Sequence, residues 1–232
     1  MATSFICGGV LVSPSVAITA KECVSGMSAS DLTVRVGLTP ATQTNITVDS
    51  IVSMSSFNYT SLENDVAILR LSSPTTSTPY AVLASPNSTT LTFSRSRRSS
   101  PRPTLSRNKS PLTYRPAFLN SSLTIYGWGP PTSNTQSLSP HLLSAPVSLI
   151  PTSSCAQTLA ECHFPLDPVQ RLCTSSTTQG MAAYGDAGGP VVDEQGTVVA
   201  LITGNPRCAQ PNGIGIKLRL DGKGVGGWLA GV

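Results

Sequence analysis

The 232-residue sequence predicts an all-β fold, because short apolar or alternating runs are separated by turn residues throughout. Turn formers are abundant, with 19 glycines and 19 prolines, and 11% of the residues are charged against 39% hydrophobic. A chain of this length can bury a substantial core as one large domain or two smaller ones. The expected architecture is therefore a β-barrel or a β-sandwich.

Five runs have the character of strands. Residues 32–37 alternate between polar and apolar side chains, which is typical of a half-buried strand, and residues 65–71 form the more continuous apolar run of a buried one. Residues 123–129 are a further predicted strand. Residues 190–192 and 196–202 predict a hairpin across the Asp-Glu-Gln-Gly turn between them.

The most informative motif is the hexapeptide Gly-Asp-Ala-Gly-Gly-Pro at residues 185–190. It resembles the Gly-Asp-Ser-Gly-Gly-Pro signature of the trypsin/chymotrypsin-like serine proteases, in which the third residue is the nucleophilic serine. Ala187 occupies that position here, and its methyl group has no oxygen to attack a carbonyl. The chain is similar to this family in its signature but lacks the nucleophilic atom.

Two further segments carry the same resemblance. Residues 7–14 and 18–23 are similar to the family's Cys-Gly-Gly segment and its Leu-Thr-Ala-Ala-His-Cys segment, with Glu22 at the position of the general-base histidine. Asp65, in the run Asn-Asp-Val-Ala-Ile-Leu, matches the third member of the triad. The resemblance extends from Phe5 to Trp228, apart from one basic stretch.

The resemblance implies two six-stranded antiparallel β-barrels packed face to face in a single trypsin-like domain. The first barrel would comprise residues 1–92 and be truncated at its N-terminus, and the second would comprise residues 118–232. The family ends in a helix packed on the second barrel, which corresponds here to residues 221–229. These contain four glycines, each of which costs up to ~1 kcal/mol inside a helix, so this helix is expected to be short or frayed.

Residues 93–117 are predicted to be a disordered basic insert between the barrels. The stretch Phe93–Pro116 has seven basic residues and no acidic one, whereas the rest of the chain has eight basic residues against 11 acidic ones. Asp65 and Ala187 are 122 residues apart, against about 93 for the corresponding pair in the family template. The excess is about the length of this stretch, whose Ser- and Arg-rich composition cannot bury apolar area.

Three interpretations of this insert stay open: a solvated interdomain loop, a translated intron or frame-shifted stretch, and a polyanion-binding arm. In the last case the contacts would come from Arg95, Arg97, Arg98 and Arg102.

The expected chemistry of the site is that of a protease that has lost catalysis. The family mechanism needs a serine to attack and a histidine to move the proton, and Ala187 and Glu22 supply neither. The chain's two histidines, His141 and His163, lie in no matching motif. The oxyanion-hole positions, Gly185 and Ala187, act through backbone N–H groups and so survive as a remnant.

The surroundings of the site are altered as well. Active family members pair the aspartate at the position of Asp186 with a free N-terminal amine, so here this region is expected to be zymogen-like, locally disordered or satisfied by another donor. Met181 stands where a trypsin has an aspartate at the base of its specificity pocket, and Ala183 replaces a cysteine. Pro206, in the substrate-binding segment, has no N–H to pair with an extended peptide.

The resemblance implies two of the family's disulfides, Cys7–Cys23 in the first barrel and Cys155–Cys173 in the second, which leaves two cysteines to bridge each other or provide a free thiol. Those two are Cys162 and Cys208. The rival to the second disulfide is a zinc site, although its spacing fits no common zinc pattern. Its ligands would be Cys155, Cys162, His163 and Cys173.

Three carboxylates, Glu22, Asp65 and Asp186, would cluster if the barrels pack as in the family. A metal or a glycosidase-like carboxylate pair is one hypothesis for them. The favoured alternative is structural: Asp65 hydrogen-bonds the backbone near its strand, and Glu22 faces solvent. No cofactor and no metal are predicted.

Other features indicate an extracellular, monomeric protein. The cysteines favour disulfides, and Asn-x-Ser/Thr sequons are candidates for glycosylation. These sequons are at Asn45, Asn58, Asn87, Asn108 and Asn120. No apolar run approaches the ~18 residues that a membrane span needs. No secretory signal is visible, so the given N-terminus is expected to be incomplete.

The resemblance to inactive members of the family implies a secreted binding protein, such as an inhibitor, a decoy or a recognition factor. One such group is the oomycete glucanase inhibitor proteins, which block host endo-β-1,3-glucanases; the expected partner is accordingly an extracellular protein, for instance a host hydrolase. Two alternatives stay open: an active trypsin-like serine endopeptidase, and a degenerate gene product without function.

Overall fold

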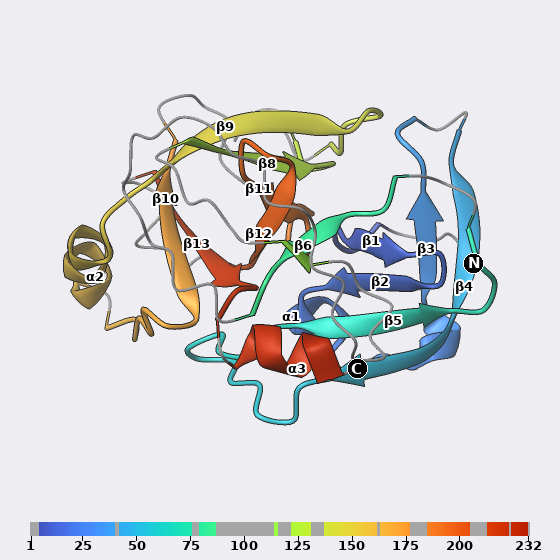
Figure 1. Cartoon of the computed structure of the whole chain (residues 1–232), viewed down its shortest axis with the longest axis horizontal. Coiled ribbons are helices and arrows are strands. Elements are labelled where there is room, and N and C mark those ends of the chain that lie inside the picture. The colour runs from blue at the N-terminus through green and yellow to red at the C-terminus, as the bar shows by residue number, and fades with distance from the viewer. Residues whose placement is uncertain are drawn as a thin grey trace.

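The structure, a computed structural model, describes ten ranges of the chain. They are residues 5–39, 42–75, 79–86, 114–115, 122–130, 137–161, 163–176, 185–204, 213–222 and 224–231. Two β-sheets dominate it and lie beside one another, with three short helices at their margins (Figure 1).

The first sheet is a curled half-barrel of five described strands in the order β1-β2-β5-β4-β3, all paired antiparallel. The strands are β1 (Val10–Ser13), β2 (Val16–Thr19), β3 (Thr33–Val36), β4 (Thr44–Ser53) and β5 (Ala67–Leu71). A short helix α1 (Lys21–Val24) follows β2, and a 3₁₀ turn η1 (Ala29–Asp31) precedes β3. Every residue of β2 is buried, because Val16 and Ile18 pack in one apolar cluster and Ala17 packs in another.

The second sheet closes on itself. Six strands run in the order β11-β8-β9-β10-β13-β12, and β12 pairs again with β11 to complete a barrel. They are β8 (Ser122–Gly127), β9 (Leu143–Leu149), β10 (Arg171–Ser175), β11 (Pro190–Val192), β12 (Thr197–Ile202) and β13 (Ile214–Arg219). A linking strand β6 (Val82–Ala84) adds to β12 in parallel, and helix α2 (Thr152–Ala160) joins β9 to β10. The predicted two-barrel, all-β fold is confirmed, with five strands described in the first sheet.

The predicted strands occur close to their expected positions. The run at 32–37 contains β3, the run at 65–71 contains β5, and the run at 123–129 overlaps β8. The hairpin of β11 and β12 is confirmed, and its turn is closed by the Asp193 carboxylate, whose Oδ1 accepts the N–H groups of Gln195 at 3.0 Å and Thr197 at 2.8 Å. The ten-residue strand β4 has no clear apolar alternation, and the sequence did not predict it.

A single apolar cluster joins the two sheets. It takes buried side chains from β1, β2 and β5 on one side and from β6, β12 and β13 on the other. Its buried members are Val10, Val12, Val16, Ile18, Val66, Ile68, Leu83, Val198, Leu201, Leu218, Leu220, Val225 and Leu229. The barrels therefore share one core at their interface and are not independent units.

The C-terminal helix is short, as predicted: α3 spans Val225–Gly231. The helix was expected to pack on the second barrel, and it also contacts the first sheet, because Val225 and Leu229 belong to the apolar cluster that joins both sheets. Figure 1 shows α3 next to β5 of the first sheet.

The predicted basic insert lies mostly outside the described residues, and so do the four arginines proposed to contact polyanions. Two residues of the range 93–117 differ from the predicted disorder. Tyr114–Arg115 form strand β7, which pairs in parallel with β6. In this pairing Leu83 lies opposite Tyr114 and Ala84 lies opposite Arg115. The domain boundaries at residues 92 and 118 otherwise stay predictions.

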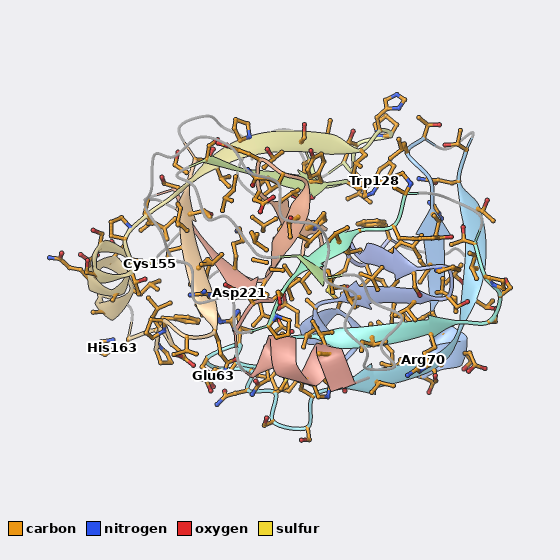
Figure 2. The ribbon with its side chains drawn as sticks, viewed as in Figure 1. Glu63, Arg70, Trp128, Cys155, His163 and Asp221 are labelled. Carbon is orange, nitrogen blue, oxygen red and sulfur yellow. A yellow bond between two sulfur atoms is a disulfide. The ribbon has the colours of Figure 1, made fainter. Side chains whose placement is uncertain are left out.

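Both disulfides implied by the resemblance are present. Cys7 and Cys23 link the segment before β1 to α1, and Cys155 and Cys173 link α2 to β10. The second pair excludes the zinc site considered for these cysteines. Figure 2 shows Cys155 on the outer side of the second barrel, in α2. No helix in the described ranges has the length and apolarity to span a membrane.

Replacing Cys155 and Cys173 together by alanine should lower the free energy of unfolding by about 2–4 kcal/mol, because the bridge closes an 18-residue separation. Chemical denaturation measured by intrinsic fluorescence would test this. Unchanged stability would contradict the presence of the bridge in the folded protein.

Candidate functional site

Glu22 and Asp65, at the positions of the triad histidine and aspartate, lie together at the start of α1. Asp65 precedes β5, and its Oδ1 accepts the backbone N–H of Glu22 at 2.7 Å. Glu22 is in the first turn of α1, where N–H groups lack partners within the helix. Asp65 thus caps α1. The backbone role predicted for it is correct, although its partner is α1 and not its own strand.

The Glu22 side chain is half-buried and bonded within the protein, so the expectation that it simply faces solvent was incomplete. Its Oε1 accepts the backbone N–H of Gly204 at 2.8 Å, a contact between residues 182 positions apart. Gly204 follows β12, so this hydrogen bond joins α1 of the first sheet to the second barrel. An unpaired backbone N–H after the strand end gives the carboxylate a better partner than solvent.

The nucleophile position is at the turn before β11. The carbonyl of Ala187 accepts the N–H of Gly8 at 2.8 Å, and its methyl packs on the apolar cluster of the first sheet. Gly185 has φ +94°, a backbone conformation that favours glycine. Among the described residues, no acceptor is found for the N–H groups of Gly185 and Ala187, the two donors of the oxyanion-hole remnant.

Asp186 is buried against the end of β8. Its Oδ1 accepts the N–H of Gly129 at 2.7 Å, so another donor does satisfy this carboxylate. A Cβ at Gly127 or Gly129 would lie within 2.5 Å of the carboxylate, so that only glycine fits at either position of the Gly-Trp-Gly segment. Trp128 itself is half-buried (Figure 2).

A cavity of about 240 Å³ adjoins this carboxylate. It is lined by Ile125, Tyr126, Gly127, Gly129, Pro130, Leu143, Ser144, Ala145, Asp186 and Ile202. The lining is mainly apolar, with the Asp186 carboxylate as its charged group.

The field of a buried cation of the second barrel, Arg171, acts on the Asp65 carboxylate. Arg171 is 2% exposed; its guanidinium donates to Thr203 Oγ1 at 3.2 Å and to the carbonyl of Ser61 at 3.2 Å. Burial lowers the pKa of Arg171 to about 10, and the fields of Asp65 and Glu22 oppose that shift. Arg171 therefore offsets part of the negative charge between the barrels.

Asp65 is nevertheless strained electrostatically. It is 0% exposed, and within the described residues its Oδ2 has no hydrogen-bond partner. Burial and, to a smaller extent, the charge of Glu22 together raise the pKa of the Asp65 carboxyl to about 7, against the opposing effects of the Glu22 N–H and Arg171. This pKa reflects a carboxylate without the side-chain donor that a histidine would have provided.

Several predicted site residues are not brought into this arrangement. Asp186 is bound to Gly129, apart from the Glu22–Asp65 contact, and no group of three potential metal ligands occurs in the described ranges. His141 and His163 are exposed, and Figure 2 places His163 beside α2 at the outer edge of the second barrel. No described histidine replaces the missing base.

Other predictions fall outside the described residues. These are Met181, Ala183, Pro206, Cys162, Cys208, Asn87, Asn108 and Asn120. Asn45 and Asn58 are exposed, and the Asn58 Oδ1 already accepts the N–H groups of Thr60 and Ser61 at 2.8 and 3.2 Å.

Sequence reasoning missed two buried cations, Arg171 and Lys217. The burial of Lys217 could have been predicted, because this lysine lies between Ile-Gly-Ile and Leu in the apolar run that forms β13. Arg171 opens the run Arg-Leu-Cys-Thr-Ser, and nothing in the sequence distinguishes it from a surface residue.

Comparison with known proteins matches this geometry to one family. The family model described as Trypsin matches residues 1–222. Trypsin alpha of Drosophila melanogaster is 28% identical over 215 residues, which covers 92% of this chain and 73% of the relative. Trypsin Blo t 3 of Blomia tropicalis is 25% identical and covers 96% of this chain and 79% of the relative.

Solved structures show the same fold. The scabies mite inactivated protease paralogue S-D1 superposes with a TM-score of 0.69 at 20% identity and covers 93% of this chain and 82% of that one. The VesB protease of Vibrio cholerae superposes with a TM-score of 0.66 at 23% identity, covering 93% of this chain and 56% of that one.

The raised pKa of Asp65 gives a testable pH dependence. The folded carboxyl binds its proton more tightly than the unfolded one, whose pKa is near 3.8. The contribution of Asp65 to the free energy of unfolding is therefore fully present below pH 4 and is lost as the pH rises towards 7. Asp65→Asn removes this titration and keeps an oxygen for the Glu22 N–H. We expect the variant to be more stable than the wild type above pH 7, by up to about 4 kcal/mol.

Urea denaturation between pH 4 and pH 8 measures this effect. Asp49→Asn, which removes an exposed carboxylate from β4, is the matched control and should keep the wild-type slope. A slope that persists in Asp65→Asn would contradict the assignment.

Proposed function

This chain belongs to the trypsin family of serine proteases, and we propose that it is a member that has lost catalysis and acts as a secreted binding protein. The observation that carries the proposal is the pair of side chains at the reacting positions. Ala187 presents a methyl group to the apolar cluster of the first sheet, and Glu22 presents a carboxylate to the N–H of Gly204. Neither group can attack a carbonyl as part of a serine–histidine pair.

The Glu22–Gly204 hydrogen bond also argues against binding of an extended peptide along the segment after β12. An extended peptide pairs with a sheet edge through backbone N–H and C=O groups. The Gly204 N–H, just beyond the end of β12, is already taken by a carboxylate on the facing sheet. Pro206, two residues on, has no N–H to offer. The proposed binding surface is therefore formed by loops away from the segment after β12.

Secretion is supported by the two disulfides, since such bridges persist in oxidising compartments, and by the exposed sequons at Asn45 and Asn58. The partner that we propose is an extracellular protein, with a host hydrolase such as an endo-glucanase as the kind to test first. The structural likeness to an inactivated mite protease paralogue supports the idea that this fold can persist after catalysis is lost. The arginines of the basic insert would add a contact with a polyanion.

Active proteolysis is the competing proposal. The named relatives are trypsins, and no acceptor is found among the described residues for either oxyanion-hole donor. A hydrolysis assay separates the two proposals directly, whereas a degenerate product would show neither hydrolysis nor a partner.

The unmodified protein should hydrolyse broad peptide and ester substrates at least about 10⁴-fold more slowly than a trypsin assayed alongside, because two triad members are absent. The double variant Ala187→Ser/Glu22→His restores both groups. We expect it to stay poor, since the pocket position Met181 and Pro206 are also altered. Each single variant serves as the control, and appreciable hydrolysis by the unmodified protein would overturn the proposal.

Capture of a partner tests the binding role. The intact chain and a variant with Arg95→Gln, Arg97→Gln, Arg98→Gln and Arg102→Gln would be exposed to extracellular fluid of host or neighbouring organisms. Capture of a hydrolase by both forms, with its activity lowered, is the expected result. Capture by the intact chain only, lost at modest salt, would assign binding to the arginines. Capture by neither form would contradict a binding function.

A further inference from the structure

A lysine side chain lies inside the second barrel. Lys217, on β13, is 1% exposed. It lies directly opposite Leu172 of β10 and Ile202 of β12, and both of these belong to the apolar cluster that fills the barrel. Because cross-strand neighbours share a face of the sheet, Lys217 projects into the barrel and not towards solvent.

Its ammonium group lies at one end of the barrel. A Cβ built on Gly215 would be 2.5 Å from the Lys217 Nζ and 3.0 Å from Thr174 Oγ1. The side chain therefore runs back along β13 towards the residue two positions earlier, and the ammonium takes the space that a side chain at Gly215 would need. This is the end at which β8, β10 and β12 finish and β9, β11 and β13 begin.

Asp186 lies at the same end. Its carboxylate is held against Gly127 and Gly129, where β8 ends, and it lines one cavity together with Ile202, the cross-strand neighbour of Lys217. The turn that carries Asp186 is fastened to Ile202 as well. Gly188 donates to the Ile202 carbonyl at 2.7 Å, and Ile202 donates to the Gly189 carbonyl at 2.8 Å.

The two groups are complementary in charge and poorly solvated. Asp186 is 7% exposed, and in the described part of the chain Lys217 makes no hydrogen bond or salt bridge. A buried ammonium is costly unless a nearby charge offsets the loss of water. Burial lowers the pKa of Lys217 to about 8, and among the charged groups of the described residues the field of Asp186 opposes that shift.

We propose that Lys217 is the internal counter-charge of Asp186, and that the pair holds the turn of residues 185–189 in place from within the barrel. The turn that carries the nucleophile position would then owe its conformation to a side chain of β13. This role is independent of whether the chain hydrolyses peptides or binds a partner. Lys217 acts as a positioning residue, since it supports the turn through Asp186.

The pKa of Lys217, measured by NMR of the intact chain with labelled lysine, tests the pairing. In Asp186→Asn the amide oxygen can still accept the Gly129 N–H, but the negative charge is gone, so we expect the pKa of Lys217 to fall by about one unit. Asp193→Asn is the matched control: Asp193 is also buried, its Oδ1 also accepts backbone N–H groups, and it lies at the opposite end of the barrel. An equal pKa in wild type and Asp186→Asn would overturn the proposal.

Hydrogen exchange provides a second readout that needs only Lys217→Met. If Lys217 holds Asp186, its loss should make the amides of Gly188 and Ile202 exchange several-fold faster than in the wild type, while the amide of Leu220, bonded to Val199 at 3.0 Å, keeps its rate. If the lysine were merely a desolvated group, methionine would relieve its cost and these amides would exchange no faster. Unchanged or slower exchange would therefore reject the pairing.

Discussion

The rest of the structure depends on the apolar cluster that joins the two sheets. The first sheet is open, so Val10, Ile18 and Ile68 can leave water only by packing on side chains such as Leu201 and Leu218 of the second barrel. This packing brings α1 close to the segment after β12. Glu22 and Gly204 meet for that reason, and the same proximity would have assembled a catalytic triad had its side chains been present.

Two buried carboxylates of this structure are each influenced by the field of a buried cation. Asp65 faces the field of Arg171 at the junction of the sheets, and Asp186 faces that of Lys217 at the barrel end. Buried ions gain little from one another once desolvation is counted. The contribution of Asp65 to the fold is therefore the hydrogen bond with which it caps α1, a role that does not depend on its charge.

The sequence supported the two-barrel fold because its signatures lie at turns with strict backbone needs, such as the φ of Gly185 and the close approach of Asp186 to Gly129. It also assigned Glu22, Asp65 and Ala187 to the three positions of the catalytic triad. The hydrogen-bond partner of the Glu22 carboxylate could not be predicted, since it is a backbone N–H 182 positions away. Every residue except proline has such a group, so the sequence does not show which one the carboxylate binds. Arg171 was missed for a similar reason, because its burial arises only where β10 meets the first sheet.

The position of α3 has a consequence for the order of events during synthesis. Val225 and Leu229 complete the cluster to which β1 and β2 contribute some two hundred residues earlier. The apolar side chains of β1 and β2, which are synthesised first, are therefore fully covered only when the residues of α3 have been synthesised. Until residue 229 has emerged, Val10 and Ile18 present an incomplete surface of the kind that chaperones recognise, and folding must finish after translation of this domain, not during it.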